Sequence, residues 1–191
     1  MNNTAPRDKE TLILETTLNL IAARGFHDTP MSLIAKESGV SAGIIYHYFE
    51  NKEALIRSLY WQIKRRFTAA IMADDPQAMP FPDHVKHIWL MAYRFYLTNP
   101  REALFLEQYE NSPFSQGMLE TGDDPHLQTL IDLIQQDYAA RHIKELPFEV
   151  LYQLTLGVAV GLAKQQIAGL IDLDDATLDA IADSCCRAVM P

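Results

Sequence analysis

The chain has 191 residues, of which 48% are hydrophobic and 21% are charged, so it can form one sizeable core with a small satellite domain. This composition excludes an intrinsically disordered chain and a miniature disulfide-stabilised fold. The two cysteines, Cys185 and Cys186, are adjacent and cannot bridge each other in ordinary geometry, which favours a reducing compartment. The first ten residues lack an apolar signal segment, and the apolar run around 154–163 is too short to span a membrane. We therefore expect a soluble, cytoplasmic protein.

The formal net charge is -9, which is unusual for a protein that binds nucleic acid, but the charge is divided unevenly. Residues 1–70 contain nine Lys or Arg and seven Asp or Glu, a net charge of +2, whereas residues 71–191 contain seven and eighteen, a net charge of -11. The mildly basic N-terminal part can approach phosphate, and the acidic remainder would be repelled by it. The two parts are therefore expected to have different partners.

Apolar residues recur at helical spacing throughout, without a typical hairpin turn or sustained period-two alternation. The sequence predicts an all-α fold with about nine helices, because proline and glycine punctuate the chain at suitable intervals. The predicted helices are 8–24, 30–38, 42–48, 51–73, 82–98, 101–111, 125–142, 147–169 and 174–189.

We expect two domains. Residues 1–50 form an N-terminal three-helix domain with a helix-turn-helix, and residues 51–191 form a larger helical domain, with the helix at about 51–73 as the connector. Local signals support the helix ends in the first part. Thr29-Pro30 is typical of an N-cap followed by proline at the first helical position, and Asn51 is a typical N-cap for the connector.

Residues 30–48 have the pattern of a helix, a short turn centred on Gly39 and a second helix, which is the geometry that places a helix in the major groove of DNA. The second helix begins with small residues that let its backbone approach base edges and phosphates. Aromatic and basic donors follow. The residues concerned are Ser41, Ala42 and Gly43 at the start of the helix, then Tyr46 and His47, and Lys52 at the start of the next helix.

The segments GFHDT from Gly25, GVSAGIIYHYF from Gly39 and NKEAL from Asn51 closely resemble the DNA-binding domain of the TetR/AcrR family of transcriptional regulators. The resemblance covers about fifty residues and implies that Tyr46, His47 and Lys52 bind DNA phosphates. Two positions depart from the family pattern: Ala42 stands where many relatives have Lys or Arg, and Ile44 stands where many have a polar residue. Ile44 can contact a thymine methyl group or belong to the core. The candidate DNA-binding residues are Thr29, Ser41, Ala42, Gly43, Ile44, Tyr46, His47 and Lys52.

The same resemblance implies that the C-terminal helices bind a small-molecule effector and form a homodimer, with no cofactor. Several aromatic residues there are spaced three, four or seven apart, a pattern found both in pockets and, more often, in cores. A cavity lined by them would favour a largely apolar effector. The candidate ligand-binding residues are Tyr60, Phe67, Trp89, Tyr93, Tyr96, Phe105 and Tyr109.

Small residues in the segment 151–170 would let a neighbouring helix approach closely, either within one subunit or across a dimer interface. Together with the last helix, this segment is expected to form a four-helix dimer interface. The candidate interface residues are Gly157, Gly161, Leu178 and Ile181.

Signals for catalysis are weak. His84 and His87 are three residues apart beside Asp83, a spacing that suits a metal, but no third ligand is evident nearby, and we interpret them as surface histidines. The motifs of phosphate loops, zinc proteases and serine hydrolases do not occur. We therefore predict a ligand-responsive DNA-binding transcriptional regulator, a repressor released from a palindromic operator by a small molecule, and not an enzyme. The alternatives are a helical protein-interaction module and a small helical metalloenzyme.

Overall fold

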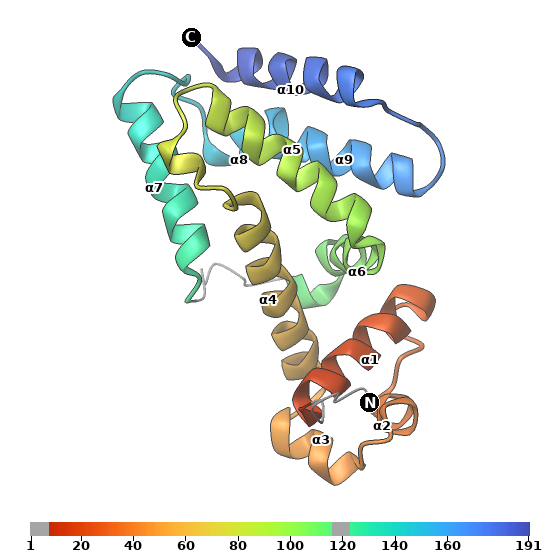
Figure 1. Cartoon of the computed structure of the whole chain (residues 1–191). Coiled ribbons are helices and arrows are strands. Elements are labelled where there is room, and N and C mark those ends of the chain that lie inside the picture. Colours follow the sequence, from red (N-terminus) through yellow and green to blue (C-terminus); the bar gives the residue numbers. More distant parts are fainter. Residues whose placement is uncertain (1–7, 116–122) are drawn as a thin grey trace, which may run out of the picture. The chain divides into compact units, whose positions relative to one another are not determined.

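A computed structural model describes residues 8–115 and 123–191, and all regular secondary structure within these ranges is helical (Figure 1). The predicted all-α class is therefore confirmed. The α-helices are α1 (Lys9–Arg24), α2 (Met31–Ser38), α3 (Ala42–Tyr48), α4 (Lys52–Ile71), α5 (Asp83–Thr98), α6 (Pro100–Glu110), α7 (Pro125–Ala139), α8 (Phe148–Leu154), α9 (Leu156–Ile167) and α10 (Asp175–Val189). Two short 3-10 helices are η1 (Pro76–Ala78) and η2 (Pro113–Ser115).

The described residues form two compact units. The first consists of those within Met1–Ile63 and Arg101–Glu120, and the second of those within Lys64–Pro100 and Thr121–Pro191. The boundary between the units falls inside α4, so this helix contributes to both. These units are defined by packing alone and not by function. The predicted division into functional domains between residues 50 and 51 therefore stays a prediction.

The first unit is built around the apolar faces of its helices. In α1, Ile13, Leu14, Leu18 and Ile21 are buried, as the helical spacing requires. The α1–α2 connection packs on α6, because the Phe26 ring lies 5.7 Å from that of Phe105, between ring centroids. This unit therefore holds α2 and α3 on a core that also includes α6.

In the second unit α5 is the central helix, and both α9 and α10 pack against it (Figure 1). Lys86 on α5 is 2.7 Å from Asp179 and 2.8 Å from Asp183, both on α10. These contacts raise the pKa of Lys86 and lower the pKa of Asp183, mainly through the hydrogen bonds that link them. The two acceptors lie one helical turn apart on α10, so one lysine of α5 contacts both.

Two local expectations were wrong. The predicted helix 147–169 is interrupted at Thr155, where φ is -119° and ψ is -95°, so that α8 ends and α9 begins. The Thr155 hydroxyl donates to the Leu151 carbonyl (2.7 Å) at this break. At the start of α2 the N-cap is Pro30 rather than Thr29, because the Thr29 hydroxyl donates backwards to the Gly25 carbonyl (2.8 Å).

Within the described ranges, no helix is both long enough and apolar enough to cross a bilayer.

Candidate functional site

The helix-turn-helix consists of α2, a turn at Gly39 and α3. Gly39 has φ 67° and ψ 11°, a left-handed conformation that glycine adopts without strain, and it ends α2. The turn is stabilised by the Ser38 hydroxyl, which accepts from the Val40 N–H (3.3 Å). Val40 itself is buried and anchors the start of the next helix. These local contacts set the direction of α3 relative to α2.

One face of α3 is buried and the other is exposed. Ile45 and Phe49 are 1% and 4% exposed and attach the helix to the first unit, because residues four apart lie on the same side of a helix. Tyr46 is 53% exposed, and the neighbouring His47 is also exposed. Ile44 is intermediate, which leaves both of its expected roles open.

The small residues at the start of α3 leave its first turn uncovered. Ser41, Ala42 and Gly43 are all exposed, and the Ser41 side chain makes no capping hydrogen bond. A Cβ atom built on Gly43 would meet no atom within 4 Å. Packing within the chain therefore does not explain why residue 43 is a glycine.

Lys52 begins α4, where Asn51 is the N-cap and its side chain accepts from the Ala54 N–H (2.8 Å), as predicted. The Lys52 ammonium donates to the Phe26 carbonyl oxygen in the α1–α2 connection. Partial burial lowers the pKa of Lys52. The side chain is thus engaged within the first unit, and its proposed contact with phosphate requires it to leave or share this carbonyl.

Thr29 differs from the other candidate DNA-binding residues because its side chain is buried. Its hydroxyl donates to Gly25 and its N–H donates to the Phe26 carbonyl (3.4 Å). Both donors are therefore used inside the first unit, and a direct DNA contact by Thr29 stays a prediction.

The seven candidate ligand-binding aromatics form two groups, one in each unit. Tyr60, Phe105 and Tyr109 belong to the first unit, where Tyr60 stacks on Tyr109 with ring centroids 4.4 Å apart. Phe67, Trp89, Tyr93 and Tyr96 belong to the second unit and are at most 5% exposed. Six of the seven side chains are buried, all except Tyr60. Their contact with an effector stays a prediction.

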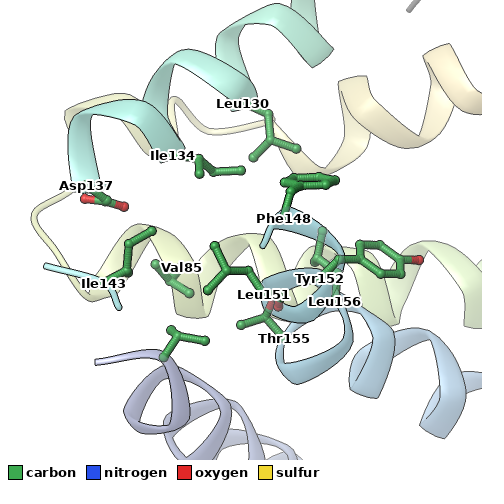
Figure 2. A pocket seen from close by; sticks show the side chains of 11 residues that line it. Val85, Leu130, Ile134, Asp137, Ile143, Phe148, Leu151, Tyr152, Thr155 and Leu156 are labelled. Carbon is green, nitrogen blue, oxygen red and sulfur yellow. Dashed lines mark hydrogen bonds between the residues drawn. The ribbon is translucent and has the colours of Figure 1, made fainter. Parts of the chain in front are cut away.

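A cavity of about 90 Å³ in the second unit is lined by a different set of residues (Figure 2). These are Val85, Leu130, Ile134, Asp137, Ile143, Phe148, Leu151, Tyr152, Thr155, Leu156 and Val189. None of the seven aromatics is among them. Sequence reasoning missed these residues because aliphatic side chains carry no local sign that distinguishes a cavity wall from a core.

The expectation that His84 is a surface histidine was wrong, since it is 4% exposed. Its Nε2 lies 2.7 Å from a carboxylate oxygen of Asp137 on α7, and the Nδ1 of His142 lies 3.2 Å from the other oxygen. His87 is part-buried, with its Nε2 2.9 Å from the Ala73 carbonyl oxygen. Among the residues described, no group of three side chains is suited to hold a metal ion.

The four candidate interface residues lie on α9 and α10. Gly157, Gly161 and Ile181 are half-buried, whereas Leu178 is 7% exposed and packs within its own chain. A Cβ on Gly157 would lie 2.8 Å from Gln153 Oε1, at the end of a flexible side chain, and 3.2 Å from the Tyr152 carbonyl oxygen, so space beside this glycine is limited within the chain. A Cβ on Gly161 would meet nothing within 4 Å.

Both the N-terminal and the C-terminal part of the chain match known families of bacterial transcriptional regulators. Residues 13–59 match the family of bacterial regulatory proteins called the tetR family, and residues 80–190 match the tetracyclin repressor-like C-terminal domain. An uncharacterised HTH-type transcriptional regulator of Haemophilus influenzae is 27% identical over 185 residues, which cover 97% of each chain. A fatty acid metabolism regulator protein of Bacillus subtilis is 29% identical over 171 residues, covering 87% of this chain and 81% of that protein.

Solved structures of TetR-family regulators have a similar fold. A TetR-family transcriptional regulator of Haemophilus influenzae has a TM-score of 0.83 at 27% identity, covering 96% of this chain and 97% of the other. A TetR-family regulator of Marinobacter aquaeolei has the same fold, with a TM-score of 0.86 at 21% identity and 95% coverage of both chains. The chain therefore belongs to the TetR family and is a helix-turn-helix transcriptional regulator, in a family whose members bind operator DNA as dimers and are typically ligand-responsive repressors.

Proposed function

We propose that this regulator binds a pseudo-palindromic operator as a homodimer through the exposed face of α3, and that a largely apolar effector bound in the second unit releases it. The observation that carries the DNA-binding part is the exposure of Tyr46 and His47 on a helix that the buried residues Ile45 and Phe49 attach to the first unit. Their hydroxyl and imidazole groups are suited to phosphate contacts, which fix the position of the helix on DNA. The two copies of α3 then occupy half-sites about 34–36 Å apart, one turn of the double helix, or a little more.

The first turn of α3 supports this proposal. Ser41, Ala42 and Gly43 are small and exposed, and space within the chain would admit a larger residue at position 43. Close approach of DNA to the backbone gives a reason for glycine there, because a side chain would separate the helix from the groove. Ala42 and Ile44 contribute apolar contacts to thymine methyl groups, and Lys52 contributes a phosphate contact.

Binding to the DNA upstream of the coding region, measured by electrophoretic mobility shift, tests the proposal with two tyrosines of α3. Tyr46 and Tyr48 are 53% and 40% exposed, and they are about 200° apart around the helix, so they lie on different sides of it. Tyr46→Ala should weaken binding to all DNA sequences alike. Its far-ultraviolet circular dichroism spectrum should match that of the parent, which shows that the variant is folded. Tyr48→Ala should have a much smaller effect. Equal losses from the two variants, or no loss from Tyr46→Ala, would contradict the assigned face.

The dimer is proposed to form through α9 and α10, which both pack on α5 and also carry exposed residues. Gly161 and Ile181 support this because both are only half-buried in the single chain. Gly157 contributes close approach, and Leu178 supports the surface from within its own subunit. This placement brings together two copies of a helix pair, which is a common arrangement in four-helix interfaces.

A further inference from the structure

The second unit contains two adjoining cavities, of about 90 Å³ and about 80 Å³. Every lining residue belongs to the second unit, so the site does not depend on the first. The residues that line both cavities are Val85, Leu130, Ile134, Asp137, Thr155 and Leu156. The two cavities are therefore parts of one site between α5, α7 and the junction of α8 with α9.

The site is apolar over most of its length. In Figure 2, aliphatic side chains of α5 and α7 face those of α8, while Asp137 lies at one end of the labelled group and Tyr152 at the other. Phe148 in the wall is 52% exposed, so a large apolar ring adjoins solvent. The site is divided into two adjoining cavities that are each smaller than the ~150 Å³ that holds one benzene ring, which favours a thin aliphatic chain that occupies both over a fused ring system.

The polar end is formed by Asp137 and the imidazole of His84, and His142 contacts Asp137 from outside both cavities. Asp137 is 6% exposed and is the one charged residue that lines either cavity. Its carboxylate lies 2.7 Å from His84 Nε2, a contact that the neutral imidazole makes as a donor when its proton is on Nε2. His142 approaches the second oxygen of the carboxylate. The negative charge of Asp137 disfavours an anionic ligand at this end.

His84 carries an unsatisfied acceptor. It lines the second cavity, and its buried Nδ1 has no hydrogen-bond partner in the described part of the chain. In the neutral ring with the proton on Nε2, Nδ1 can only accept a hydrogen bond. A buried acceptor without a partner is costly, so a donor supplied by a ligand is favoured there.

We propose that this cavity binds an amphiphile with a thin aliphatic chain and a hydrogen-bond donor at one end, a hydroxyl or an ammonium group. The chain lies between α5, α7 and α8, and the donor reaches His84 Nδ1 and Asp137. A carboxylate at that end lacks a donor and is repelled by Asp137. This inference rests on the proposed ligand response, because it specifies the site and chemistry of the effector.

Isothermal titration of the full-length protein with octan-1-ol, octylamine and octanoate tests the chemistry of the polar end. The three probes share one chain length and differ only in the terminal group. Saturable binding of the alcohol or the amine, at least tenfold tighter than that of octanoate, is expected. Preference for octanoate overturns the assignment of the polar end, and the absence of saturable binding by all three overturns the site.

Two filling variants test the location. Val85→Phe and Leu156→Phe each place extra volume in the walls shared by both cavities, and both residues are only partly buried, so the cost to folding is limited. Leu170→Phe is the matched control, since Leu170 is 75% exposed and lines neither cavity. The filling variants should abolish binding of the alcohol and the control should retain it. Full binding by both folded filling variants overturns the location.

His84→Gln tests the acceptor, because the glutamine amide can donate to Asp137 from near the position of Nε2 but lacks Nδ1. Because this variant loses one neutral hydrogen bond to the ligand, its affinity for octan-1-ol should fall by about fivefold. His142→Gln is the control, as it changes a more exposed partner of the same carboxylate, and it should leave the affinity within twofold. Equal affinities of His84→Gln and the parent would remove His84 from the site.

The effect of octan-1-ol on the complex with upstream DNA separates this inference from the proposed function. Binding with operator release supports both. Binding that leaves the DNA affinity unchanged retains the cavity and contradicts its role in regulation. A further outcome is that the Val85→Phe variant still releases the operator when a ligand retained from the cell is added. That result would support the proposed function and overturn this cavity as the effector site.

Discussion

Gly161→Leu distinguishes a dimer seam on α9 from packing within a single chain. A Cβ on Gly161 would meet nothing within 4 Å in its own chain, so the first side-chain atom of a larger residue causes no steric conflict in the isolated subunit. Removing a glycine from the interior of α9 (Leu156–Ile167) should instead stabilise that helix, by about 0.5–1 kcal/mol. A loss of association would therefore come from the partner subunit.

The expected size follows from overpacking. Extra methylenes in a closely packed seam cost about 1–3 kcal/mol, which raises the dimer dissociation constant by about 5- to 150-fold. Gly161→Ala is the matched control, because it gains the helix propensity with little volume. It should remain as dimeric as the parent and melt at the same or a slightly higher temperature.

Sedimentation equilibrium over a range of concentrations measures the two dissociation constants, and circular dichroism confirms that each variant is folded. A folded Gly161→Leu variant with the dissociation constant of the parent would place the interface elsewhere. A variant that unfolds would show that residue 161 is packed more closely than the single chain indicates, which also contradicts the reasoning.

Three further predictions concern charge and exposure. Lys52→Ala should reduce the magnitude of the salt slope of DNA binding by about 1, and an unchanged slope would mean that the ammonium stays on its carbonyl partner in the chain. Because Lys86 lowers the pKa of Asp183, the stabilising contact is present above the ordinary Asp pKa of about 4 and is lost as the pH falls through the lower folded pKa. Lys86→Met should therefore flatten the acid limb of thermal stability, and an unchanged limb would contradict this. Burial raises the pKa of the Cys186 thiol to about 11, so that about one molecule in a thousand is thiolate at pH 8. Alkylation should be slow in the native protein and fast in urea, and rapid native labelling would contradict the observed burial.

Much of the helical order was predictable because the signals at helix starts are local. Asn51, Asp124 and Asp174 each accept a hydrogen bond from an N–H two or three residues later in the chain, and the predicted starts fall within one residue of the observed ones. Thr155 shows the limit of such signals. The chain there has no proline, and the hydroxyl contact that accompanies the break also occurs in continuous helices.

The exposed and buried faces of α3 were easier to predict from the sequence than the cavity, for a physical reason. The exposed and buried faces of α3 follow from helical periodicity over seven residues. The pair of His84 and Asp137, by contrast, joins residues 53 positions apart. A lone aspartate on α7 is indistinguishable from a solvated one until the partner helix is known. The aromatic residues were the natural candidates for a ligand site, but six of the seven side chains are buried in the structure.

The path of the chain between the two units limits how an effector can act. One crossing, between Ile63 and Lys64, lies inside α4, and another, between Pro100 and Arg101, lies at the start of α6. An effector bound in the second unit can change DNA binding only by shifting the balance between two arrangements of the chain. The ligand supplies only its difference in affinity for these arrangements, typically about 1–3 kcal/mol or 5- to 150-fold in DNA affinity. A molecule that fits the cavity equally well in the free and DNA-bound forms will not release the operator, however tightly it binds.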